Sequence, residues 1–369
     1  MSWKSSGAAR SNNFDFLRFA LATLVIYSHS FDLKWWGDHE LLNRLSRHQL
    51  SFGELSVDMF FVMSGFLITH SWLRSKHLYD FLQKRVLRIY PAFIVAVTLT
   101  VFLIGPVAVT GKFHVEIGRM IAGLLNLRGY EPANLFLHNP APGVLNGSLW
   151  SISYEFWCYI GVALLGLVAA LKFPRAMLAM FLISIGVGAM FAAHPQFKPG
   201  GKFLGLILGN PRFWARLLPY YMAGVVFYLW RDRIPQSPII ASLALMLAAA
   251  GFLIPKIGVA IFFPLAATYL IFYVAYLPIP GLWHWAKFGD FSYGMYLYAF
   301  PIQQWIVMHN RDISPTMLFA LAAPATLIAA IASWYLVERP FLKMKKRPAR
   351  QLPDAELHQK PNVGQVAAA

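Results

Sequence analysis

Long apolar stretches are the feature that most limits what this chain of 369 residues can fold into. A helix needs about 20 mostly apolar residues to cross roughly 30 Å of hydrocarbon, because each residue adds about 1.5 Å. A backbone inside lipid must also satisfy its own hydrogen bonds, so each such stretch predicts a helix. The chain contains ten windows of this kind, at 16–33, 55–72, 90–109, 150–171, 176–193, 213–230, 238–254, 258–277, 290–309 and 317–337.

The composition agrees with a membrane domain. Hydrophobic residues make up 58% of the chain and charged residues 13%, about half of the charged share that is typical of soluble domains. No polar block is long enough for a separate soluble domain of ordinary size. We therefore expect an all-α fold: a polytopic membrane helix bundle of about ten transmembrane helices. It would span residues 14–341, between an N-terminal segment (1–13) and a basic, disordered tail (342–369).

The positive residues predict the orientation. Nineteen of the 32 Lys and Arg residues fall in connections on the side of both termini, and twelve fall on the other side, whose loops are longer in total, when Arg216 near the start of its window is counted with them. Cytoplasmic loops collect cations, so we expect a multi-pass protein of the cell (inner) membrane with both termini cytoplasmic. The net charge of +16 clusters between apolar runs and forms no stripe with interleaved aromatics, which argues against a nucleic-acid partner.

The first window, FDFLRFALATLVIYSHS, carries Arg18 and His29. At about 100° per residue, eleven residues return to nearly the same helix face, roughly 16 Å further along the axis. Snorkelling to the headgroups is an alternative explanation for Arg18, but this explanation does not apply to His29. An ionisable residue inside a membrane is a functional candidate, so this face predicts a polar route through the bundle.

The same arithmetic places two carboxylates. Asp58 lies about one turn below the outer surface in the second window, and Glu155 lies roughly 8 Å below the outer start of the fourth. We therefore expect His29, Asp58 and Glu155 to share one layer as catalytic residues. A carboxylate beside an imidazole would hold one ring nitrogen and leave the other free to exchange a proton. The alternatives are that Asp58 caps its helix and that Glu155 pairs with a loop cation.

A cluster of cations precedes the third window, in the segment YDFLQKRVLRIYPAF. It contains Lys84, Arg85 and Arg88, and the two arginines lie one turn apart. They could present two guanidinium groups to a polyphosphate. Ordinary anchoring by positive residues on the cytoplasmic side is the alternative.

Other polar features receive simpler interpretations. Ser64-Gly65, in the middle of the second window, favours close helix packing over a serine nucleophile. The run GDHE at 37–40 is the only compact His and carboxylate cluster and is interpreted as solvated, so no metal site is predicted. The connection 110–149 is either a lid or acceptor-binding surface, or an ordered connecting loop.

Six motifs occur in order along nearly the whole chain. They are Arg18-(ten residues)-His29, FFVMSGFLI at 60–68, Arg85-x-x-Arg88 followed by Tyr90-Pro91, SLWSISYEFWCY at 148–159, FSYGMYLYAFPI at 291–302 and VERPF at 337–341. Each motif is weakly specific alone, but the set resembles membrane-bound acyltransferase family 3, in its stand-alone polysaccharide O-acyltransferase form.

This resemblance implies a ten-span bundle that takes an acyl group, commonly acetyl, from cytoplasmic acyl-coenzyme A as co-substrate. The group is placed on a hydroxyl of an extracytoplasmic carbohydrate, such as an exopolysaccharide or lipopolysaccharide. By position, His29 matches the family's catalytic histidine and Arg18 its partner in the first helix. Arg85 and Arg88 match the pair at the acyl-donor end, and Glu155 lies in the family's SLW segment.

The chain departs from the family pattern at Ala299, where many members have a histidine. One hypothesis is consistent with both the residues and the resemblance. In it, the phosphates of coenzyme A bind to Arg85, Arg88 and Lys84, and the thioester extends past Arg18 to His29. Carbohydrate or lipid-linked glycan, membrane lipid and polysaccharide assembly machinery are the expected partners. A proton-coupled secondary transporter is the alternative function, since it would also be a ten-span bundle with buried ionisable residues. A channel or scaffold component of an export complex is a third.

Overall fold

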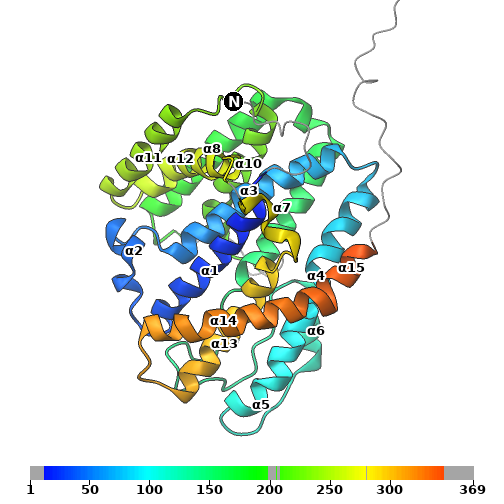
Figure 1. Ribbon diagram of the computed structural model, residues 1–369, viewed down its shortest axis with the longest axis vertical. Helices are drawn as coiled ribbons and strands as arrows, with labels where there is room; N and C mark the ends of the chain where they lie inside the picture. The colour runs from blue at the N-terminus through cyan, green and yellow to red at the C-terminus, as the bar shows by residue number, and fades with distance from the viewer. Residues whose placement is uncertain (1–11, 198–204, 206–207, 280, 345–369) are drawn as a thin grey trace, which may run out of the picture.

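The computed structural model describes residues 12–197, 205, 208–279 and 281–344, and these ranges fold into helices joined mostly by short connections (Figure 1). Their only β-type pairing is an isolated bridge between Val109 and Leu135. Most of the expected N-terminal segment and basic tail lies outside the described residues. The ten principal helices are α1 (Phe14–Asp32), α3 (Phe52–Leu73), α4 (Leu78–Leu103), α7 (Trp150–Leu167), α8 (Pro174–Ala193), α10 (Pro211–Trp230), α11 (Pro238–Leu253), α12 (Gly258–Ala275), α13 (Ser292–His309) and α14 (Pro315–Ser333).

Shorter helical pieces complete the described chain. Two of them extend α14, so that one continuous helical stretch runs from Pro315 to Lys343. The short elements are η1 (Gly37–His39), α2 (Leu41–Leu45), α5 (Gly105–Ala108), α6 (Ile117–Leu125), η2 (Ala170–Lys172), η3 (Leu282–Lys287), η4 (Trp334–Glu338) and α15 (Arg339–Lys343).

Each of the ten apolar windows overlaps one principal helix, which confirms the all-helical fold, although α4 begins at Leu78, twelve residues before its predicted window. Within the described residues, five helices are long and apolar enough to cross a membrane by themselves. The number of spans and the side of each terminus stay predictions. The five helices are Phe52–Leu73, Leu78–Leu103, Pro174–Ala193, Gly258–Ala275 and Pro315–Lys343.

Local sequence signals fix where several helices begin. Ser51 caps α3 by accepting a hydrogen bond from the backbone N–H of Glu54, whose side chain accepts one from the backbone of Ser51 in return. Asn210 and Ser314 cap α10 and α14 in the same sense. In both of these helices a proline follows the cap, where its missing N–H costs nothing.

The two helices at the centre of the bundle pack on different partners. Figure 1 shows α1 and α3 in the middle, with α8, α10, α11 and α12 on one side and α13 and α14 on the other, in agreement with the contacts between these helices. Gly65 of α3 and Gly224 of α10 let these two helices touch. A Cβ added at Gly65 would lie 2.1 Å from the carbonyl oxygen of Tyr221, and one at Gly224 would lie 2.0 Å from that of Val62. Close packing is therefore the role of Gly65, as its position in the sequence predicted.

The long connection before α7 is fixed to the bundle by buried polar groups. Glu131 accepts hydrogen bonds from the backbone N–H groups of Leu145 and Asn146, and the Asn146 amide donates to the carbonyl of Leu297 in α13 at 2.8 Å. Burial raises the pKa of the Glu131 carboxyl to about 7, although the two N–H groups act in the opposite direction. This connection therefore has a defined position over α13.

Candidate active site

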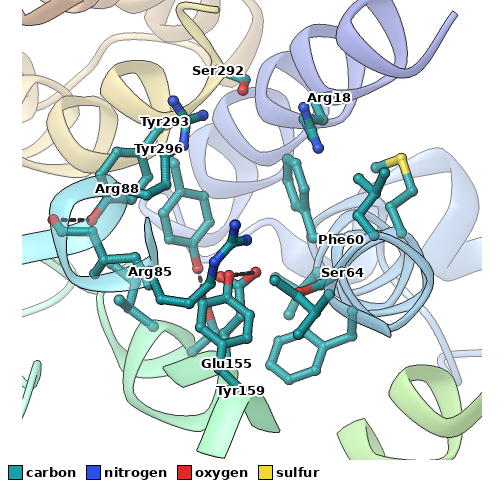
Figure 2. Close-up of a pocket in the computed structure, with 18 residues that line it drawn as sticks. Arg18, Phe60, Ser64, Arg85, Arg88, Glu155, Tyr159, Ser292, Tyr293 and Tyr296 are labelled. Carbon is teal, nitrogen blue, oxygen red and sulfur yellow. Dashed lines mark hydrogen bonds between the residues drawn. The ribbon is translucent and has the colours of Figure 1, made fainter. Parts of the chain in front are cut away.

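A cavity of about 160 Å³ lies between α1, α3, α4, α7 and α13 (Figure 2). Its charged lining consists of Arg18, Arg85, Arg88 and Glu155, which are four of the seven residues that the sequence predicted for the site. They come from three helices that are far apart in the chain. Three guanidinium groups and one carboxylate therefore line the cavity, and further acidic residues stand behind two of the guanidinium groups. Its hydroxyl groups come from Ser64, Ser151, Tyr159, Ser292, Tyr293 and Tyr296.

Arg85 has no carboxylate partner in the described part of the chain. Its Nη2 donates to the Ser71 hydroxyl at 3.3 Å, and its guanidinium carbon lies 5.8 Å and 5.9 Å from the ring centres of Phe81 and Tyr159. Its Nε is buried and makes no hydrogen bond. Figure 2 shows the guanidinium beside Glu155 and Tyr159. A charge held by aromatic faces and one hydroxyl remains available to an anionic ligand.

Arg88 and Arg18 are held by acidic residues instead. The Nη2 atom of Arg88 lies 2.6 Å from a carboxylate oxygen of Asp290, and its Nη1 atom lies 3.8 Å from Glu338. The same oxygen of Asp290 lies 3.7 Å from Nη1 of Arg18, which also pairs with Asp15 at 3.1 Å. One carboxylate thus links α1 to α4 at the edge of the cavity.

The inner wall of the cavity contains two hydrogen-bonded tyrosines. The Tyr159 hydroxyl donates to Glu155 at 2.7 Å, one turn away on α7. The hydroxyl groups of Tyr296 and Ser151 lie 2.6 Å apart and tie α13 to α7. These bonds hold Glu155 and the phenol groups in fixed positions facing the space beside Arg85.

His29 lies beyond this cavity and does not line it. Its Nδ1 atom is 3.5 Å from a carboxylate oxygen of Asp32, three residues later on α1. Its ring meets the ring of Phe300 edge-on, with 5.2 Å between the centres. Phe300 follows the cavity residue Tyr296 by one turn of α13, so His29 and the cavity are neighbours along this helix.

The remaining predicted residues have other surroundings. Asp58 is buried, pairs with Arg216 at 3.2 Å and lines a different cavity on another side of α3. Lys84 pairs with Asp80 at 2.7 Å and does not line the first cavity. The layer expected for His29, Asp58 and Glu155 is therefore divided among three environments. The carboxylate beside His29 is that of Asp32, and neither Asp58 nor Glu155 contacts the ring.

Three acidic residues that the structure brings to the site were not predicted from the sequence. Glu338 is the acid of the VERPF motif, and Asp290 immediately precedes the FSYGMYLYAFPI motif. Asp32 follows His29 by three residues, a spacing that places both on one helix face. Ala299, where the chain departs from the family pattern, has a fully buried side chain between α1 and α14.

Comparisons with known proteins agree with these motifs. The sequence profile of a family described as "Acyltransferase domain" matches residues 11–337. An O-acetyl transferase of Shigella phage Sf6 is 29% identical, with 90% of this chain and 96% of the relative covered. Nodulation protein 10 of Rhizobium leguminosarum bv. viciae is 28% identical over 90% of this chain and 94% of the relative. Acyltransferase MdmB of Streptomyces mycarofaciens is 24% identical over 94% and 96%. No solved structure matches significantly.

Proposed function

Because the chain belongs to the acyltransferase domain family, and is a membrane O-acyltransferase, we propose that it takes its acyl group from cytoplasmic acyl-coenzyme A. The acyl group, acetyl in the simplest case, goes to a hydroxyl of an extracytoplasmic carbohydrate, such as an exopolysaccharide, a lipopolysaccharide or a lipid-linked glycan. In this proposal the chain crosses the cell's inner membrane ten times, with both termini in the cytoplasm.

The observation that carries the proposal is a cavity wall on which the Arg85 guanidinium forms no ion pair with any described residue. Three guanidinium groups and one carboxylate line it, and Arg85 has no carboxylate within 4.0 Å in the described residues. Coenzyme A is a polyanion, and a guanidinium is well suited to phosphate because it can donate two parallel hydrogen bonds. Arg85 is thus the principal phosphate ligand. Lys84, which pairs with Asp80 outside the cavity, is a secondary ligand in this proposal.

The size of the cavity suits the reacting end of the donor. A water molecule needs about 10–15 Å³ of cavity volume, so this cavity of 160 Å³ has room for roughly ten waters. That is enough for a short acyl group and the sulfur-bearing end of coenzyme A. The Tyr296 hydroxyl can accept a hydrogen bond from Ser151 and donate its own proton to the thioester carbonyl, which would stabilise charge that develops on the carbonyl oxygen.

His29 is the general base in this proposal. Asp32 faces Nδ1, which leaves Nε2 to remove the proton from the acceptor hydroxyl. The hydroxyl oxygen forms a bond to the carbonyl carbon, the carbon–sulfur bond breaks, and the thiolate of coenzyme A takes up a proton. The acceptor approaches from the side of Phe300 and the donor from the side of Arg85.

The test uses the protein reconstituted in sealed vesicles. Radiolabelled acetyl-coenzyme A is added on the side of the membrane that corresponds to the cytoplasm, and a hydroxyl-bearing polysaccharide is present on the other side. The proposal predicts label bound covalently to the polysaccharide. A transporter would instead move solute across the membrane without covalent labelling, and a scaffold component would do neither. Label confined to the donor side would refute the proposed transfer across the membrane.

A further inference from the structure

A second cavity, of about 610 Å³, lies on another side of α3 and shares no lining residue with the first. It is formed at one end of the bundle, by the first turns of α3, α10 and α12, the last turns of α8 and the loop before α3. The acyl-transfer mechanism gives it no role.

One wall of this cavity, formed mainly by α8 and α12, is apolar. It is lined by Gly188 and Ala192 of α8, Pro219 of α10, and Val259 and Ala260 of α12. Several of these side chains are small, so the three helices leave space between them. Such a surface gives a favourable environment to a hydrocarbon chain and an unfavourable one to a sugar or a free ion.

The rim of the cavity is polar and carries cations that its own acids do not neutralise. Arg216 is held by Glu54 at 2.9 Å and by Asp58 at 3.2 Å, which uses both acidic residues of the lining. Arg212 and Lys256 also line the cavity, and neither forms an ion pair in the described residues.

Two further observations point to an anion at this rim. The Nε atom of Arg212 is buried without a hydrogen-bond partner, which is costly for a charged group unless a ligand satisfies it. Both α10 and α12 begin here, and the N-terminus of a helix favours negative charge. His48, at the same rim, lies 3.5 Å from Asp38 and is therefore already paired.

We propose that this second cavity binds a phosphate ester carried on a single apolar chain. The phosphate lies between Arg212 and Lys256, and the chain enters the apolar space between α8, α10 and α12. Under the proposed function, such a ligand corresponds to a glycan acceptor attached to a lipid phosphate. Only this last identification rests on that function, because the binding site itself is argued from the cavity.

The experiment measures binding of farnesyl phosphate to the purified full chain in a non-ionic detergent, by isothermal titration calorimetry without any acyl donor. We expect saturable binding with one site per chain. Farnesol has the same chain without the phosphate, and inorganic phosphate lacks the chain, so each should bind at least tenfold more weakly. Dioleoyl phosphatidic acid, which stands for bulk lipid, should compete at least tenfold less well.

Variants assign the site. The double change Arg212→Gln and Lys256→Gln should weaken farnesyl phosphate binding at least tenfold, since it removes two charge-assisted contacts. Arg311→Gln, which alters a cation outside both cavities, should leave it unchanged. Melting curves of each variant control for folding, and Lys256→Gln alone, at an exposed position, provides a variant with little structural risk.

Equal binding of farnesol, of inorganic phosphate or of phosphatidic acid would overturn the inference, as would unchanged affinity in the folded double variant. These outcomes leave the acyl-transfer proposal intact, because no assay here contains acyl-coenzyme A. Conversely, failure of labelled acyl transfer would not alter the affinity for farnesyl phosphate.

Discussion

The carboxylate of Asp290 lies 2.6 Å from the guanidinium of Arg88, and this ion pair gives Arg88 a different role from Arg85 on the same helix, α4. Arg88 is engaged by Asp290 and Glu338, whereas Arg85, one turn earlier, contacts one hydroxyl and two aromatic rings. The sequence motif presents them as an equivalent pair. In the folded chain, Arg85 is the one open to a ligand and Arg88 is part of the framework.

Arg85→Ala should weaken donor binding without unfolding the protein. A lost charge-assisted hydrogen bond costs about 1.5–3 kcal/mol, which corresponds to roughly a tenfold to hundredfold higher KM for acyl-coenzyme A. Steady-state kinetics with varied donor measure this value. Lys84→Ala provides the comparison: its ammonium is paired with Asp80 outside the cavity, so the rise in KM should be smaller. An unchanged KM in Arg85→Ala would return this residue to a purely topological role.

Arg88→Ala should reduce stability rather than donor affinity alone. It leaves the side chains of Asp290 and Glu338, which are 13% and 1% exposed, without their shared cation. Removing one partner of a buried ion pair typically costs about 3–5 kcal/mol. The melting temperature in detergent should therefore fall well below those of the wild type and of Arg85→Ala. If Arg88→Ala melts with the wild type, these ion pairs do not stabilise the fold.

Gly65→Ala should disrupt the contact between α3 and α10. The added Cβ would lie 2.1 Å from the backbone oxygen of Tyr221, which cannot move without shifting α10. The matched control is Gly161→Ala on α7, where an added Cβ meets nothing within 4 Å and where alanine favours the helix by about 1 kcal/mol. Thermal unfolding should show severe destabilisation of the first variant and equal or higher stability of the second. The reverse order would contradict this packing.

The stability of the connection before α7 should depend on pH through Glu131. Burial raises the pKa of its carboxyl to about 7 in the folded chain, above its ordinary value near 4.5. The folded state therefore binds the proton more tightly, so the contribution of Glu131 to stability is largest below about pH 4.5 and decreases as the pH rises to 7.

Melting temperatures between pH 5 and 8 measure this slope. The Glu131→Gln variant should lose the part that comes from this group. Glu116→Gln, an exposed residue of the same connection, should keep the slope of the wild type. Identical slopes in all three proteins would refute the assignment to Glu131.

The helices were predictable from the sequence because the bilayer imposes a simple rule on length and polarity. The ten windows overlap the principal helices, and Arg18, Arg85, Arg88 and Glu155 do meet in one cavity. Depth along a helix can be counted from the sequence. The count did not place Glu155, however: it predicted one layer with His29 and Asp58, whereas Glu155 lines the cavity of the three arginines.

What could not be predicted is which neighbour each helix face meets. Asp58 lies at a suitable depth for the predicted layer, but its face of α3 turns toward Arg216 of α10. No local sequence pattern indicates that partner. The same holds for Asp290, whose partners lie far away in the chain. Asp32 is different, since its spacing from His29 is local and could have been noticed.

Asp32→Asn should show whether this carboxylate positions His29. A positioning role predicts a lower kcat with little change in the donor KM, because the ring loses a fixed orientation while the donor cavity is intact. Asp32→Glu should recover part of the rate. A change confined to KM, or no recovery by glutamate in a folded protein, would contradict this role.

The decisive experiment is acyl transfer by His29→Ala at saturating donor. General-base assistance typically contributes about 10² to 10⁴ in rate, so transfer of labelled acetyl to the polysaccharide should fall by at least a hundredfold. Donor binding and the melting temperature should remain close to those of the wild type. A folded His29→Ala protein that transfers the label at the wild-type rate would show that His29 is not the base.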